Sequence, residues 1–224
     1  MKKIILLAVV ALGAQQHTQA QSIGKGTGLL SGSIGYSSDS ETYENTAGST
    51  NSTTTIRFST FSINAAVGTF VADNFAIGLD VNHTATGGKY EASNNSFPLR
   101  QPAAATTLRV GPFAQYYRMV SEQFGLFGTL GAGYASDYKQ TGSGAGGYSN
   151  LYGRGFYASL TPGIVFLPIP KFGLTATMGS LGYTRLNITT EDQPDGFEDV
   201  ASSFAAGFGI RQLQFGGVYY FGRK

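Results

Sequence analysis

The side chains that could do acid–base chemistry in this chain are few. Histidine is the usual general base near neutral pH, and the chain has two histidines, His17 and His83. His83 lies in the stretch VNHTATGG, and the residue two positions further on is Ala85 rather than a serine nucleophile. A base without a nucleophile or an acid beside it performs no acyl transfer. We therefore expect His83 to be a surface histidine and the chain not to be an enzyme.

An acidic segment is the one candidate for metal binding. Its sequence is NITTEDQPDGFEDV, with carboxylates at Glu191, Asp192, Asp195, Glu198 and Asp199. It lacks the spacing of a calcium loop, so we expect a solvated surface, with a bound divalent cation as the open alternative. The glycine-rich stretches GKGTG and GSGAGG stand in no strand–loop–helix context that would bind phosphate. We expect no metal and no cofactor.

Composition and the first residues indicate export. Residues 1–20, MKKIILLAVVALGAQQHTQA, have two lysines, a short apolar run and a small residue before Gln21, which is typical of a cleaved signal peptide. The apolar run is too short for a transmembrane helix. Without Lys2 and Lys3, residues 21–224 are formally neutral and form a single predicted domain. There is no cysteine, and no basic stripe that would bind nucleic acid.

Most of the remaining sequence alternates between apolar and polar residues, which is the period of a β-strand. In the segment from Phe75 to Ala85, Ile77, Leu79 and Val81 alternate with glycine, aspartate and asparagine. Eight such segments recur. They are joined alternately by short turns, VADN, MVSEQ and LPIPK, and by long polar loops. We predict an all-β fold, an eight-stranded antiparallel up-and-down barrel.

Two barrels fit this alternation. A soluble, lipocalin-like barrel would turn the apolar face inward, whereas a transmembrane barrel turns it outward into lipid. Short turns at one end and four long loops at the other favour a bacterial outer-membrane barrel, with periplasmic turns and extracellular loops. Aromatic residues near the short turns would then form a girdle where the bilayer meets water. The predicted girdle consists of Phe70, Phe75, Tyr116, Phe124, Phe166, Phe172, Tyr219 and Phe221.

The opposite face of each strand should line the lumen. Eight strands leave an interior that side chains nearly fill, so we expect a largely plugged lumen. The predicted polar lumen residues are Asn64, Asp80, Asn82, Arg109 and Gln115, together with Thr129, Ser159, Thr161, Thr175 and Gln214. Asp80 and Arg109 fall at similar heights on neighbouring strands, which predicts an internal ion pair. The alternative is that each meets water or a different partner.

Two places interrupt the pattern. Pro162 lies within a predicted strand, where its missing N–H indicates a bulge or a strand edge. Before Arg211 and Gln212 the apolar residues have even numbers, and after them odd numbers. A bulge near Arg211 and Gln212 that changes the register is the preferred interpretation, and the alternative is that the membrane strand begins at about Leu213 and the preceding piece packs against loops.

The stretches GTFVADNFAIGL, GPFAQYYRMVSEQFGLFGTLGAGY, LTPGIVFLPIPKFGLTATMGSLGYT and FGGVYYF resemble successive hairpins of the small outer-membrane barrel family, the OmpA/OmpX/OmpW-like porin-family barrels of Bacteroidetes type. The resemblance covers residues 24–221 and implies an outer-membrane location. It also implies contact with lipids and lipopolysaccharide, and recognition by the barrel-assembly machinery through a last strand ending at Phe221. Here Gly222, Arg223 and Lys224 follow that phenylalanine, which weakens this signal.

The resemblance leaves several functions open. The first is a structural and surface-interaction protein, and the second a narrow porin-like channel for small or apolar solutes. A remote third is a lipid-modifying enzyme of the outer membrane.

Overall fold

The computed structural model describes residues 22–47, 50–92, 104–142, 148–190, 199–209 and 212–223. No helix in these ranges is long and apolar enough to cross a bilayer. The described residues form ten strands, all paired antiparallel. They are β1 (Gly28–Ala47), β2 (Thr50–Ala72), β3 (Phe75–Ala92), β4 (Ala105–Met119), β5 (Phe124–Gly142), β6 (Tyr148–Ile169), β7 (Phe172–Met178), β8 (Ser180–Thr190), β9 (Asp199–Gly207) and β10 (Leu213–Phe221).

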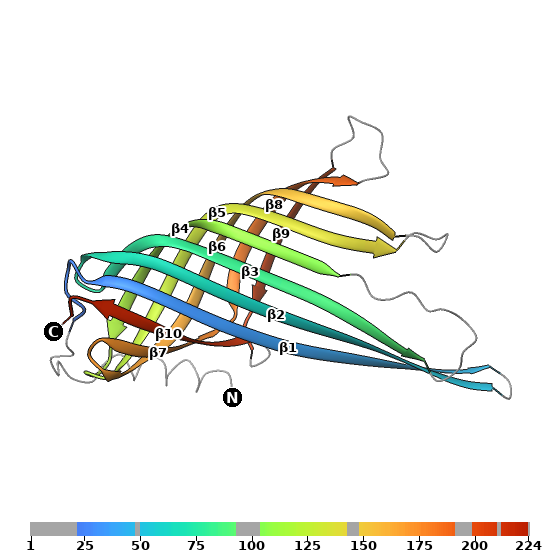
Figure 1. Cartoon of the computed structure of the whole chain (residues 1–224), viewed down its shortest axis with the longest axis horizontal. Helices are drawn as coiled ribbons and strands as arrows, with labels where there is room; N and C mark the ends of the chain where they lie inside the picture. Colours follow the sequence, from blue (N-terminus) through green and yellow to red (C-terminus); the bar gives the residue numbers. More distant parts are fainter. Residues whose placement is uncertain are drawn as a thin grey trace, which may run out of the picture.

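Eight of the strands close a barrel. Going round the wall, β1 to β7 follow one another in chain order, and β10 joins β7 back to β1. Of the two additional strands, β8 pairs with the part of β6 from Leu151 to Leu160, and β9 pairs with β8 (Figure 1). The predicted all-β, eight-stranded antiparallel barrel is therefore confirmed, with two additional strands.

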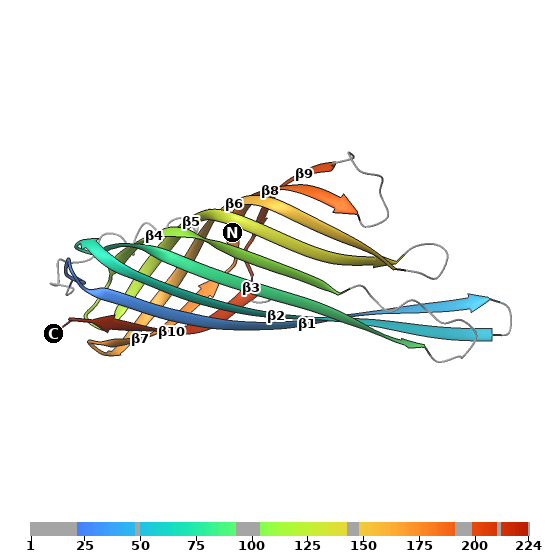
Figure 2. The ribbon, with the colours of Figure 1, turned by 45° about the horizontal axis from the view of Figure 1, so that its top comes forward.

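The two ends of the barrel differ in their connections. The turns after β2, β4 and β6 are short, and they lie at the same end as the start of β1 and the end of β10, where Gly28 pairs with Phe221. At the other end β1, β2 and β3 run well past the rest of the wall (Figures 1 and 2). We refer to these as the short-turn end and the long-loop end.

The apolar side chains of the wall point outward. Leu79 is 61% exposed, Leu130 58% and Phe215 62%, and the same face of the neighbouring strands is equally apolar. The alternate residues face a polar interior. A soluble barrel buries its apolar face, so the lipocalin-like alternative is wrong for this chain.

Most of the predicted aromatic girdle lies on this outer surface. Tyr116, Phe124, Phe166, Phe172, Tyr219 and Phe221 are all exposed, and Phe75, paired with Tyr116, is partly so. Phe70 is a correction, because it is 1% exposed and points into the barrel. Strand alternation explains this, since Phe70 has the same parity as the lumen-facing Asn64.

The wall bends where β7 becomes β8. On the short-turn side of the bend, β6 pairs with β7. On the long-loop side, the part of β6 from Leu151 to Leu160 pairs with β8. Pro162 pairs with Gly128 of β5 on one side, and on its other side it lies between the two ladders, where it has no paired residue; this position suits a residue without an N–H. Gly179 occupies the bend with a φ of 81°, and a Cβ atom there would collide with the carbonyl oxygen of Gly207. A glycine is therefore required at this position.

The last part of the chain is divided into two strands, β9 and β10, beside this bend. β9 ends at Gly207 and β10 begins at Leu213, and between them the Gln212 N–H donates to the carbonyl oxygen of Gly209 at 3.0 Å. The strand starting at about Leu213 is thus the correct alternative, although the preceding piece pairs with β8 rather than packing against loops. Arg211 lies outside the described residues.

Candidate functional site

Inside the barrel, the short-turn end is closed by a cluster of buried side chains that we call the floor. It consists of Ile23, Leu29, Phe70, Ala76, Phe113, Tyr117, Phe127, Val165, Leu167, Val218 and Tyr220. Tyr117 is at its centre, with ring centroids 5.5 Å from Phe127, 5.6 Å from Phe70 and 6.4 Å from Tyr220. Tilted and edge-on contacts at these separations stabilise aromatic clusters. The floor is a dry layer across the lumen.

The residues before β1 are hydrogen-bonded to the turn between β2 and β3 and stabilise the floor. The Ile23 N–H donates to Asn74 Oδ1 at 2.9 Å, and the Asn74 N–H donates back to the Ile23 carbonyl oxygen at 2.9 Å. The Asn74 carbonyl oxygen also accepts from the N–H of Tyr117 at 2.8 Å. Asn74 has a φ of 62°, a conformation that asparagine tolerates better than most residues. This arrangement holds the fully buried Ile23 side chain in the floor.

The residues after β10 cover the same end. Gly222 has a φ of 79° and turns the chain, and the Arg223 guanidinium then lies over the ring of Tyr220, 5.6 Å from its centroid. Arg223 is 6% exposed. Arg223, which follows the last strand, thus packs onto the barrel.

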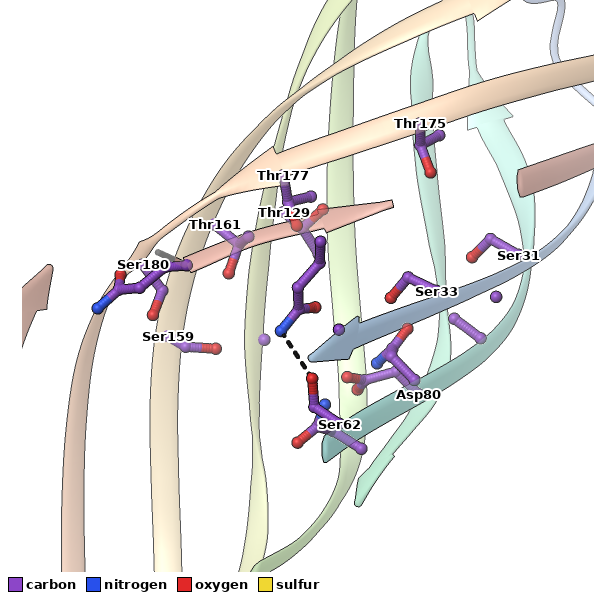
Figure 3. A pocket seen from close by; sticks show the side chains of 18 of the residues that line it. Ser31, Ser33, Ser62, Asp80, Thr129, Ser159, Thr161, Thr175, Thr177 and Ser180 are labelled. Carbon is purple, nitrogen blue, oxygen red and sulfur yellow. Dashed lines mark hydrogen bonds between the residues drawn. The ribbon is translucent and has the colours of Figure 1, made fainter. Parts of the chain in front are cut away.

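Above the floor lies a polar cavity of about 430 Å³, which we call the cup. Serine and threonine side chains from strands all round the wall point into it, and the Gln214 amide donates to the Ser62 hydroxyl at 3.2 Å (Figure 3). The structure brings together all of the polar residues expected in the lumen. These are Asn64, Asp80, Asn82, Arg109, Gln115, Thr129, Ser159, Thr161, Thr175 and Gln214. Among the described residues, the floor fills the interior at the short-turn end, a second buried cluster of Ala135, Tyr157 and Leu186 fills another part, and the cavity occupies part of the remaining space.

The expected ion pair between Asp80 and Arg109 is not formed. Tyr157 is the partner of both residues, since its hydroxyl donates to Asp80 Oδ1 at 3.5 Å and its ring lies 5.4 Å from the Arg109 guanidinium carbon. Strand register explains the separation, because Asn82 is directly opposite Arg109, whereas Asp80 is opposite Gly111. Tyr157 therefore contacts both charged groups, which are not in direct contact with each other.

Sequence reasoning missed Tyr157 and the floor. Tyr157 has the same parity on β6 as Ser159 and Thr161, which were expected to face the lumen, so alternation could have placed it. The inward rings of Phe113, Tyr117 and Phe127 could have been found in the same way. Of the floor residues, Phe70 is the one that the predicted girdle assigns to the membrane surface, by residue type rather than by parity.

Of the candidate chemical residues, the two that the structure describes, His83 and Asp199, lie outside the cup. His83 is exposed on the outer face, between Ile63 of β2 and Leu108 of β4. Glu191, Asp192, Asp195 and Glu198 fall outside the described residues, and Asp199 is exposed at the start of β9. In the described part of the chain, no group of three histidine, aspartate or glutamate residues could hold a metal ion.

The wall has a seam above the bend. The pairing of β1 with β10 stops at Ile34, and among the described residues β9 pairs with β8 alone. The cavity reaches this seam, because Gly35, Tyr36 and Ser37 line it on one side and Gly179 and Gln212 on the other.

Several solved structures are similar to the chain. The outer membrane protein OprG from Pseudomonas aeruginosa is 14% identical, with 88% of this chain and 97% of that chain covered and a TM-score of 0.47. The outer membrane protein AlkL, solved in lipid bilayers, is 14% identical over 92% of this chain and 96% of that one, with a TM-score of 0.39. The translocator domain of the autotransporter NalP from Neisseria meningitidis is 11% identical over 98% and 96%, with a TM-score of 0.39. No protein-family model matches the chain, and no curated protein matches its sequence.

Proposed function

We propose that the chain is an integral β-barrel of the bacterial outer membrane with a structural and surface-interaction role. Its apolar outer face fits lipid, and its long-loop end, with the projecting strands β1–β3, would face lipopolysaccharide and the outside (Figure 2). Assembly would use β10 and its terminal Phe221. In this proposal the barrel is a cup open to the outside and not a pore.

The floor is the observation that carries this proposal. Ions cross a barrel through a continuous water path, and the floor places fully buried rings across the lumen between the cup and the short turns. Tyr117 lies at the boundary between the cup and the floor and is 1% exposed, so almost all of its side chain is shielded from water. Burial of such rings is worth about 1.5–3 kcal/mol each, which makes spontaneous opening rare.

Planar-bilayer conductance of the purified protein tests the proposal. We expect the native chain to give no stable single-channel steps. Tyr117→Ala removes the central ring of the floor and should raise ion leakage. Tyr116→Ala is the matched control, since the neighbouring tyrosine is 58% exposed on the outer face and its loss should leave conductance unchanged. Regular conductance steps from the native chain would overturn the sealed floor.

The seam favours a second function, a narrow conduit for small or apolar solutes. Such a solute would enter the cup and leave sideways into the bilayer between β1 and β9 instead of passing the floor. Transfer of an apolar fluorescent solute from water into vesicle membranes separates the two functions. A conduit accelerates this transfer in proportion to the protein present, whereas a closed structural barrel leaves the rate unchanged.

A further inference from the structure

The cup has the size and the wall chemistry of a ligand site. Its volume of about 430 Å³ falls within the range of roughly 300–1,000 Å³ typical of small-molecule pockets. Its side walls carry hydroxyl and amide groups from strands that lie far apart in the sequence, among them Ser33, Asn64, Thr129 and Thr175 (Figure 3). Hydroxyl and primary amide groups both donate and accept hydrogen bonds, and a ligand rich in hydroxyls matches them.

The charged groups of the cup are held in place before any ligand arrives. Asp80 accepts from the Tyr157 hydroxyl, and the Arg109 guanidinium rests against the same ring, which is itself 3% exposed. The Nε atom of Arg109 is buried and has no hydrogen-bond partner within the described residues. A buried donor of this kind is costly unless a partner completes it.

The bottom of the cup is different in character. Phe113, Tyr117 and Phe127 belong to the floor and also line the cavity. A ligand that reaches them meets aromatic surface below and polar groups around its sides. Ring-shaped polyols have this distribution, with apolar C–H faces and hydroxyls around the edge, and aromatic surface favours contact with such faces.

From these features we propose that the cup binds one small, uncharged, polyhydroxylated molecule of about monosaccharide size, with Arg109 and Asp80 contacting its hydroxyls. Asp80 and Arg109 give the lining equal numbers of opposite charges, so neither an anion nor a cation is favoured. An apolar solute would displace water from the hydroxyl and charged groups of the wall without replacing its hydrogen bonds. The inference depends on the proposed function in one respect: the cup must be open to the outside so that the ligand can enter.

Binding of D-glucose to the folded barrel in detergent, followed by saturation-transfer NMR and calorimetry, tests this proposal. We expect saturable binding at one site per barrel. Cyclohexanol, a ring with a single hydroxyl, and proline, a zwitterion of similar size, should bind at least about tenfold more weakly, because they leave buried polar groups unsatisfied.

Variants then place the site. Arg109→Ala should weaken glucose binding at least about tenfold, because it removes a charge-assisted donor. Arg118→Ala is the matched control, since this arginine is on the same strand but exposed on the outer face, and it should bind glucose like the native chain. The gel mobility of unheated samples, which distinguishes folded from unfolded barrels, confirms that each variant is folded.

Two results would overturn the proposal. One is the absence of saturable glucose binding to the folded native chain, and the other is equal or tighter binding of cyclohexanol or proline. If Arg109→Ala does not fold, the measurements on the native chain still show whether the barrel binds glucose and prefers it to cyclohexanol and proline. Conductance is measured independently of glucose binding. A barrel that conducts no ions and binds no glucose would therefore contradict the proposed ligand but not the proposed function.

Discussion

At the scale of single residues, the short-turn end depends on Asn74. This residue combines a left-handed backbone conformation with a side-chain oxygen that accepts from the Ile23 N–H. Glycine keeps the first property and loses the second, whereas alanine loses both. The two substitutions therefore separate backbone strain from the hydrogen bond.

We predict that Asn74→Gly lowers the free energy of unfolding by about 1 kcal/mol, the typical net value of one hydrogen bond. Asn74→Ala should cost a further 1–2 kcal/mol or so, because alanine is strained at a positive φ. Urea unfolding of the barrel in lipid vesicles measures both. Equal stability of the two variants would contradict the left-handed conformation of Asn74.

The sequence predicted correctly which side chains face the lumen when this depended on alternation along one strand. It did not predict contacts that depend on how neighbouring strands are aligned. Parity brought Asn64, Gln115 and the other expected polar side chains to one cavity. The Asp80–Arg109 contact depended on strand register, which a single sequence does not specify, and an intervening ring took its place. Phe70 was misplaced because its residue type was given more weight than its position in the strand.

At the scale of elements, the bend in the wall depends on glycine. Gly179 joins β7 to β8 beside Gly207, where the chain crosses from β9 to β10. Gly128, in β5, has an open space where its Cβ atom would lie. The two glycines are thus a matched pair, one required and one replaceable.

We predict that Gly179→Ala destabilises the barrel by more than about 2 kcal/mol, through strain at a positive φ and a clash with the Gly207 carbonyl. Gly128→Ala should be neutral or stabilising by up to about 1 kcal/mol, since alanine restricts the unfolded chain. Thermal unfolding followed by circular dichroism compares them. A neutral Gly179→Ala would show that the bend does not need this conformation.

The strands themselves were predictable, and their interruptions only partly so. Period-two alternation and turn residues predicted the strands and their connections, because both depend on local sequence. The change of parity before Leu213 indicated that the last segment was interrupted. The matching bend at Gly179 was not predicted, since a glycine in a strand is common and its φ depends on the strand beside it.

At the scale of the whole molecule, the barrel is apolar outside, polar inside and dry at one end. The orientation of its two faces followed from the asymmetry of the loops, and the all-β barrel class is confirmed by the closed wall. Alternation could have placed the inward rings of the floor, but it could not have predicted the seam, because the seam arises between strands that meet only after the barrel closes.

The most direct test of this account measures which medium each face touches. The chain has no cysteine, so single cysteines can carry a nitroxide spin label without other changes. Suitable positions are Ile77, Leu79 and Val81 on the outer face, and Asp80 and Asn82 on the inner face; Gly78 is left out because a Cβ atom there would collide with the carbonyl oxygen of Val67. Collision rates with oxygen, which concentrates in lipid, and with a water-soluble nickel complex are then compared along β3 in reconstituted vesicles.

We predict a strict alternation, with labels at 77, 79 and 81 accessible to oxygen and labels at 80 and 82 shielded from it. Oxygen accessibility without this alternation, or the opposite alternation, would contradict the lipid-facing outer surface on which the proposed function depends.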